Sequence, residues 1–252
     1  MNQSAGTSPV PDDIGSVPWD REQLREAIEP FARLYAERPI PDNAGGMQFN
    51  HCFAVWFVLR ALQPPVVVES GVFKGQGTWL IEQACPDATI YSLDVNFGRL
   101  EWRSERAVYL ENDLMKIDWT GRDLSGAVMV FDDHSNAYRR LQEMAWLGCR
   151  RAIFEDNFPV GEGDAYSLRQ MYAGVGRTRI QVSARFRRAL KEARYAVLQK
   201  MLESKRVRHN QSLLVEPNEA DWANLARRLA VYQEIPPAWL PAEHGAWKVP
   251  WE

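Results

Sequence analysis

The sequence has no long hydrophobic run and no strong excess of charge of one sign. Its longest apolar stretch, Phe53 to Leu62, contains Arg60 and is shorter than the roughly 18 residues that suggest a membrane span. The N-terminus has neither a basic start nor an apolar core, which argues against a secretory signal. Hydrophobic residues make up 46% of the chain and charged residues 25%. These features exclude a membrane-spanning protein and predict a soluble globular one.

Cysteine is also scarce. The three cysteines, Cys52, Cys85 and Cys149, lie far apart in the sequence. An odd number of cysteines without metal-type spacing predicts reduced, mostly buried thiols and a cytoplasmic protein.

The net charge of −3 hides one basic stretch, residues 177–208, which holds 11 Lys or Arg against 2 Glu. A solvated helix face is the favoured interpretation. A basic lid over an anionic substrate, or a membrane-surface segment, is the alternative. Interleaved aromatic residues are few and the chain is acidic overall, so the sequence argues against a nucleic-acid partner. It leaves open whether the chain forms a homo-oligomer.

The spacing of apolar residues predicts two N-terminal helices followed by strands that alternate with helices. Residues 19–37 have the period of an amphipathic helix, and residues 46–62 that of a more buried one. Short β-branched runs then predict five strands, at Val66–Glu69, Thr89–Asp94, Ala107–Glu111, Ala127–Phe131 and Arg151–Phe154. A helix is expected to begin over Thr78–Ala84, and another to span Ser135–Leu147, with Ser135 as its N-cap.

This alternation predicts an α/β protein with a Rossmann-like, doubly wound, mostly parallel sheet, N-terminal helices and a helical C-terminal insertion. Ligands bind such sheets outside the carboxyl ends of the strands. We expect a flexible segment over 1–18 and a single domain over 19–252. Its parts are a core over 63–160, a helical lid over about 161–208, and a strand, helix and tail over 209–252, with the strand at Gln211–Glu216 and the helix at Ala220–Tyr232.

The first candidate for chemistry is the glycine-rich loop from Glu69 to Thr78, which directly follows a strand and precedes a helix. Glycines allow sharp turns and a close approach of backbone to ligand, and a helix N-terminus offers free N–H groups to a polar ligand. The same glycines could simply form a tight turn. The spacing of Gly71, Gly75 and Gly77 differs from the GxGxxG pattern of dinucleotide-binding dehydrogenases.

Two acidic residues follow the next strands. Asp94 ends the second strand, 23 residues beyond Gly71, where a carboxylate can accept both hydroxyls of a ribose. A simple strand-end cap is the alternative. Asn112-Asp113 follows the third strand, and a turn-forming pair is the alternative there.

The loop resembles the first motif of class I S-adenosylmethionine (SAM)-dependent methyltransferases. The form E-x-G-x-x-x-G-x-x-[ST] is similar to that of the macrolide-sugar O-methyltransferase and cephalosporin-hydroxylase group. The resemblance implies that Glu69, Gly71 and Gly75 line the methionine end of SAM. It also implies that Thr78 belongs to the cofactor site, and that Asp113 contacts the adenine.

Acidic clusters end the fourth and fifth strands, Asp132-Asp133-His134 and Glu155-Asp156-Asn157. If the strands are neighbours, about 4.8 Å apart, the clusters can converge on one ion. Carboxylate and amide oxygens suit Mg²⁺, or alternatively Ca²⁺ or Mn²⁺. Strand alternation directs Asp132 away from Asp133 and makes it the weaker candidate. Helix capping by both turns is the structural alternative.

These clusters resemble the metal sites of divalent-metal-dependent O-methyltransferases. Asp133-His134 and Asp156-Asn157 match the pairs of catechol-type enzymes, whereas Glu155-Asp156 matches the cephalosporin-hydroxylase group. The resemblance implies metal ligands at Asp133, Glu155, Asp156 and Asn157. The substrate-deprotonating lysine of catechol-type enzymes has no counterpart in 135–138. His134 is therefore a candidate base, with a buried or capping histidine as the alternative, and Asp133 is the second catalytic residue.

The sequence thus predicts a SAM-dependent, divalent-metal-assisted O-methyltransferase. Its substrate would be a hydroxyl group of a small molecule, a sugar or a natural-product intermediate. Two alternatives keep the fold: a hydroxylase-like member that does not transfer methyl groups, and an accessory protein that binds a nucleoside or a metal.

Overall fold

The computed structural model describes residues 13–14, 18–159, 163, 165–172, 229–235, 237–238, 240–241 and 247–248. The chain divides into two compact units. One comprises residues 16–133, 143–155 and 233–252, and contains the main sheet; the other comprises 1–15, 134–142 and 156–232.

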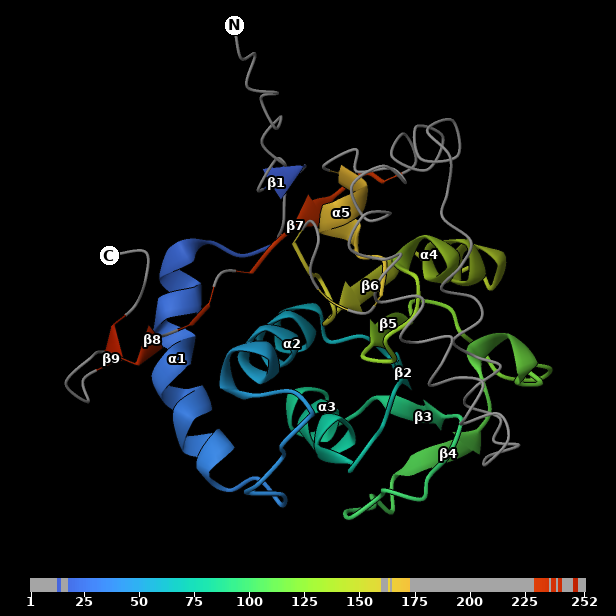
Figure 1. Cartoon of the computed structure of the whole chain (residues 1–252), viewed down its shortest axis with the longest axis horizontal. Coiled ribbons are helices and arrows are strands. Elements are labelled where there is room, and N and C mark those ends of the chain that lie inside the picture. Colours follow the sequence, from blue (N-terminus) through green and yellow to red (C-terminus); the bar gives the residue numbers. More distant parts are fainter. Residues whose placement is uncertain are drawn as a thin grey trace, which may run out of the picture. The chain divides into compact units, whose positions relative to one another are not determined.

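A five-stranded parallel sheet forms the centre of the first unit (Figure 1), with strand order β4-β3-β2-β5-β6. All five residues of the central strand are buried. The predicted Rossmann-like α/β fold is confirmed by this order. The bounds are β2 Val66–Ser70, β3 Thr89–Asp94, β4 Ala107–Glu111, β5 Val128–Phe131 and β6 Arg151–Phe154.

The register of the sheet brings the carboxyl ends of its strands to one edge. Ser70 at the end of β2 lies opposite Leu93 of β3 and Phe131 of β5. Phe131 in turn lies opposite Phe154, the last residue of β6. Residues that follow these strands therefore start from a common line, the edge at which such sheets bind ligands.

Helices make only two of the four connections between the strands. Helix α3 (Gln76–Ala84) joins β2 to β3, and α4 (Ala137–Trp146) joins β5 to β6. Residues 95–106 join β3 to β4 without a helix, and the link from β4 to β5 holds only the short 3-10 helix η1 (Leu114–Lys116). The expected alternation of strands and helices therefore breaks down on the β3–β4 side of the sheet.

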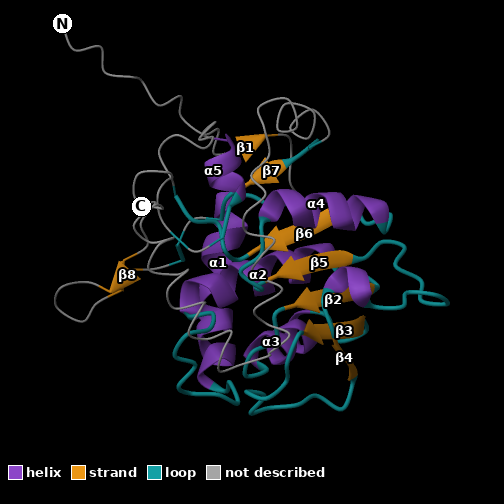
Figure 2. Ribbon diagram, turned by 45° about the vertical axis from the view of Figure 1, so that its right-hand side comes forward, coloured by secondary structure: helices purple, strands orange, loops and turns teal. Residues whose placement is uncertain are grey.

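The two predicted N-terminal helices are α1 (Arg21–Ala36) and α2 (Phe49–Leu62). A capping box starts α1, since the Asp20 side chain accepts the N–H of Gln23 and the Gln23 side chain accepts that of Asp20. Phe31 packs against Phe53 and Trp56 at ring distances of 5.5 and 5.2 Å. These aromatic contacts join α1 to α2, which lies beside α3 (Figures 1 and 2).

Two local predictions are wrong. Helix α4 begins at Ala137, and the Asn136 side chain accepts the N–H of Arg139 (3.3 Å), so Asn136 and not Ser135 caps it. The Ser135 hydroxyl instead accepts a hydrogen bond from Arg140. Tyr232 does not end a helix: Tyr232–Gln233 forms β7, which pairs with β1 (Asp13–Ile14).

The remaining described elements are short. They are α5 (Leu168–Tyr172) and an antiparallel pair, β8 (Leu240–Pro241) with β9 (Trp247–Lys248). The basic stretch over 177–208 and the predicted strand at 211–216 lie outside the described residues, and so does most of the predicted lid. No helix in the described part of the chain is long and apolar enough to cross a membrane. All three cysteines are buried free thiols, as predicted.

Candidate functional site

The glycine-rich loop owes its glycines to close approaches within the protein. Gly71 and Gly75 have φ angles of +100° and +102°, which side chains rarely adopt. A methyl group on Gly71 would lie 2.0 Å from the carbonyl oxygen of Asp132, and one on Gly75 would lie 2.1 Å from that of Trp102. Other chain segments thus press against both glycines.

Asp94, at the end of β3, holds the same loop through its side chain. Its Oδ2 accepts the backbone N–H groups of Val72 and Phe73, each at 3.1 Å, and its Oδ1 accepts that of Asn96 at 3.0 Å. The predicted ribose acceptor is therefore also the group that orients the loop.

A coil segment closes over the other end of the loop. The carbonyl of Lys74 accepts the N–H groups of Glu101 and Trp102, both at 3.0 Å, and the Lys74 ammonium lies 2.8 Å from the Glu101 carboxylate. Phe73 has a φ of +50°, and the guanidinium of Arg99 lies 5.7 Å from its ring centre. A non-glycine residue held at positive φ marks this turn as tightly constrained.

Glu69 and Thr78 lie beneath the loop. Glu69 is 1% exposed and Thr78 is fully buried, and the Thr78 hydroxyl donates to Glu69 Oε2 at 2.5 Å. Burial raises the pKa of Glu69 to about 7, against the lowering effect of the hydrogen bonds from Thr78 and Ser92. These two predicted cofactor residues are therefore buried beneath the glycine-rich loop, which they support.

Asp113, the predicted adenine contact, directly follows β4 and precedes η1. It is buried, and its side chain does not cap the 3-10 helix. Asp94 and Asp113 thus follow adjacent strands at the carboxyl edge, as the sequence predicted. Their roles toward a nucleoside stay predictions.

The first acidic cluster is joined to the central strand. The Ser70 hydroxyl donates to Asp133 Oδ2 at 2.5 Å, and the backbone N–H of Asp132 donates to the Ser70 carbonyl at 2.9 Å. Asp133 is therefore oriented toward the end of β2 by a charge-assisted hydrogen bond.

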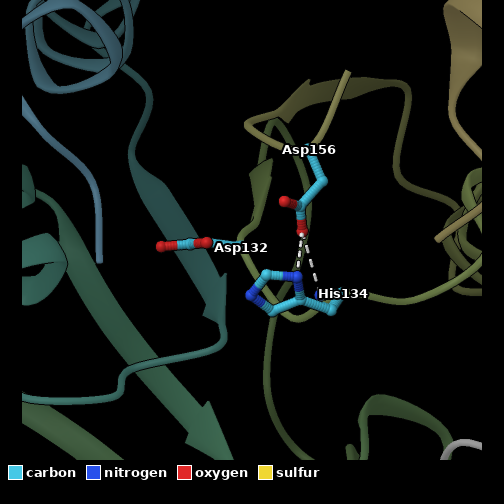
Figure 3. Close-up of side chains that lie close together, drawn as sticks. All are labelled: Asp132, His134 and Asp156. Atoms are coloured by element: carbon cyan, nitrogen blue, oxygen red, sulfur yellow. Dashed lines mark hydrogen bonds and ion pairs between the residues drawn. The ribbon is translucent and has the colours of Figure 1, made fainter. Parts of the chain in front are cut away.

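A sharp turn follows, because His134 has a φ of +51°. The backbone N–H of His134 donates to Asp156 Oδ2 at 3.0 Å, and its ring Nδ1 lies 3.5 Å from the same oxygen. Figure 3 shows this pair together with Asp132. Each of these three residues can offer one metal-ligand atom, a carboxylate oxygen or a ring nitrogen. These three atoms lie within 4.8 Å of one another.

This group shares only Asp156 with the predicted metal ligands. Glu155 Oε1 is instead hydrogen-bonded to Nδ1 of His51 on α2, with the carboxylate 10% exposed and the imidazole 58%. The side-chain oxygen Oδ1 of Asn157 accepts the backbone N–H of Arg169 at 2.8 Å, and its side-chain Nδ2 donates to the Tyr232 hydroxyl at 3.1 Å. Asn157 therefore anchors α5 and β7.

Sequence reasoning assigned His51 no role and treated Asp132 as the weaker metal candidate. His51 lies 104 positions from Glu155, and no spacing pattern links them. Asp132 carried a signal, since it belongs to the acidic cluster that ends β5.

No family model and no curated protein sequence matches the chain. Among solved structures it is similar to a “putative O-methyltransferase from Klebsiella pneumoniae”, at 18% identity over 53% of this chain and 63% of that one, with a TM-score of 0.37. It is also similar to CmcI-N160 with SAH bound (15% identity, 56% and 79% covered, TM-score 0.35). A third likeness is to the plantazolicin methyltransferase BpumL in complex with SAH (12%, 48% and 53%, TM-score 0.31).

The chain spans less than two thirds of the first of these structures and about half of the third. At these identities and TM-scores the likenesses carry no functional argument. The fold class rests on the strand order of the sheet itself.

Proposed function

We propose that this chain is a SAM-dependent O-methyltransferase and that a divalent cation assists the transfer. The observation that carries the proposal is the junction between the glycine-rich loop after β2 and the carboxylate of Asp94 at the end of β3. An acid that follows the neighbouring strand and contacts a glycine-rich strand-to-helix loop is an arrangement suited to a nucleoside at the edge of a parallel sheet.

The residues present fit SAM in their chemistry. Asp94 would accept a ribose hydroxyl, since the carboxylate has acceptor capacity beyond its three backbone partners. Gly71, Gly75 and the loop backbone would border the methionine end. Asp113, after the next strand, would contact the adenine, as the resemblance implies.

The acidic residues after β5 and β6 also fit a divalent cation. Two carboxylates, Asp132 and Asp156, and one imidazole, His134, can bring their ligand atoms together. An imidazole among the ligands suits Mn²⁺ or another transition metal as well as Mg²⁺. A bound cation would lower the pKa of a substrate hydroxyl and orient its oxygen.

The chain's own residues would fix this geometry. Ser70 orients Asp133, and the backbone N–H of His134 orients Asp156. Asp133 remains our candidate to contact the reacting hydroxyl, and His134 is proposed either as a ligand or as the proton acceptor. In-line methyl transfer depends mainly on how the acceptor oxygen is positioned relative to the methyl group. Hydrogen bonds that orient Asp133 and Asp156 would help to fix that position.

The test is calorimetric titration of the purified chain with SAM and with S-adenosylhomocysteine, each with and without Mg²⁺ or Mn²⁺. We expect micromolar binding that Asp94→Ala weakens by about tenfold or more, the loss of roughly one charge-assisted hydrogen bond. Asp123→Ala is the matched control, because this exposed aspartate also accepts a backbone N–H, from Ser125. Absence of binding under every condition would refute methyl transfer from SAM.

Binding followed by transfer of a labelled methyl group to hydroxylated acceptors would support an O-methyltransferase. Tight binding of SAM and cation without turnover of any acceptor would instead favour the nucleoside-binding or hydroxylase-like alternatives.

A further inference from the structure

A single buried carboxyl group joins three elements beneath the glycine-rich loop. Glu69 of β2 lies opposite Ser92 of β3 in the sheet register. Its Oε2 accepts the Ser92 hydroxyl at 2.8 Å and the Thr78 hydroxyl, from the first turn of α3, at 2.5 Å. These two bonds attach the start of α3 to the centre of the sheet.

The other carboxyl oxygen of Glu69 is enclosed without a donor among the described residues. It faces Gly77, where a methyl group would lie 2.3 Å from Oε1 and 3.2 Å from the end of the Met47 side chain. The carboxyl group of Glu69 thus occupies the space that a side chain at position 77 would need, and only glycine fits there. A buried charge with an undonated oxygen is strongly disfavoured, whereas a neutral acid is far less so.

The ionisable groups that act on Glu69 do not stabilise its charge. Asp94, at the end of β3, raises its pKa further through like charge, after the larger effect of burial. The Glu69 carboxyl in turn raises the pKa of Tyr109 of β4, after the larger effect of burial. The negative charge of Asp94 repels a second anion and therefore favours a protonated Glu69.

We propose that Glu69 remains protonated in the folded protein up to about neutral pH, well above the range in which an exposed glutamate ionises, and that it is a positioning residue, which holds the glycine-rich loop and the first turn of α3 from beneath. It does not bind the methyl donor through its charge. This role differs from the one that the family resemblance implies, in which Glu69 lines the methionine end of SAM. The statement about the methyl donor rests on the proposed function, whereas the protonation of Glu69 does not.

The raised pKa of Glu69 makes the stability of the folded protein depend on pH. Because folding raises this pKa from 4.5 to about 7, the folded protein gains stability that is fully present below pH 4.5 and is lost as the pH rises through 7. Between pH 5.5 and 8.5 this linkage raises the unfolding equilibrium constant by about 30-fold, so the protein is less stable at the upper end.

The experiment compares Glu69→Gln, which keeps the shape without the charge, with Glu69→Ala. The control is Glu26→Gln, at an exposed position of α1. Urea unfolding is measured from pH 5.5 to 8.5, and S-adenosylhomocysteine binding by calorimetry. We expect Glu69→Gln to remove the pH dependence of unfolding, about 30-fold in the wild type, and to keep the affinity for S-adenosylhomocysteine within about threefold. Glu69→Ala should lower the affinity by about tenfold or more.

Two results would overturn the proposal. One is a Glu69→Gln variant that stays as stable as the wild type but loses binding about tenfold, because Glu69 would then contact the ligand as an anion. The other is a Glu69→Gln variant with the full pH dependence of the wild type. If the wild type binds no S-adenosylhomocysteine, the proposed function fails, and the unfolding data still decide whether Glu69 is neutral.

Discussion

Replacing Gly75 by alanine tests whether the close approach of Trp102 explains this glycine. The added methyl group would lie 2.1 Å from the Trp102 carbonyl oxygen, so Trp102 must retreat by about 1.3 Å or more to reach an ordinary contact distance. That movement strains the hydrogen bonds from the N–H groups of Glu101 and Trp102 to the Lys74 carbonyl. Overpacking of this kind costs about 1–3 kcal/mol.

The positive φ of Gly75 adds a second cost, which a matched control can remove. Gly148 has a φ of +79°, but a methyl group there would meet no atom of the described structure within 4 Å. Gly148→Ala should therefore show the conformational cost alone, about 1–2 kcal/mol. Gly75→Ala should lower the free energy of unfolding by about 2–5 kcal/mol, the sum of the two effects.

Urea unfolding of both variants measures the difference, and calorimetry with S-adenosylhomocysteine measures its effect on binding. We expect Gly75→Ala to weaken binding because the loop moves, and Gly148→Ala to leave it unchanged. Equal destabilisation of the two variants, within about 0.5 kcal/mol, would refute the reasoning. The glycine would then serve only the turn, or a ligand.

Two further predictions separate metal ligands from structural residues among the predicted set. Asp156→Ala should lower the affinity for Mn²⁺, followed by electron paramagnetic resonance, by about tenfold or more while leaving S-adenosylhomocysteine binding intact; an unchanged Mn²⁺ affinity would show that the cation site is misplaced. Asn157→Ala should keep the Mn²⁺ affinity but lower the free energy of unfolding by about 1–3 kcal/mol, since two hydrogen bonds, from the Arg169 N–H and to the Tyr232 hydroxyl, are lost. A large loss of Mn²⁺ binding without destabilisation would instead make Asn157 a ligand.

The strands were the most predictable part of the fold. The predicted bounds of β3, β4 and β6 agree with the structure to the residue, because short β-branched and aromatic runs bounded by polar residues are a local signal. The missing helix between β3 and β4 was not predictable in this way. In its place, residues 100–102 pack over Lys74 and Gly75, which is a tertiary contact.

The site was predictable in position but less so in detail. Each proposed acid lies at the carboxyl edge, because parallel strands in register bring their ends together. The choice of Asp133 over Asp132 relied on strand alternation, which ceases to apply where the chain leaves β5. The positive φ of His134 redirects the chain there, and the backbone N–H of His134 donates to Asp156. A left-handed histidine has no reliable sequence signature.

The polar groups at the sheet edge are already engaged within the protein, and this determines how a ligand could bind. A carboxylate offers about four acceptor positions. At Asp94 the N–H groups of Val72 and Phe73 use Oδ2, and that of Asn96 uses one side of Oδ1. One position remains, enough for a single ribose hydroxyl. A second hydroxyl would have to displace a backbone N–H of the glycine-rich loop, so nucleoside binding and loop conformation should be coupled through this one side chain.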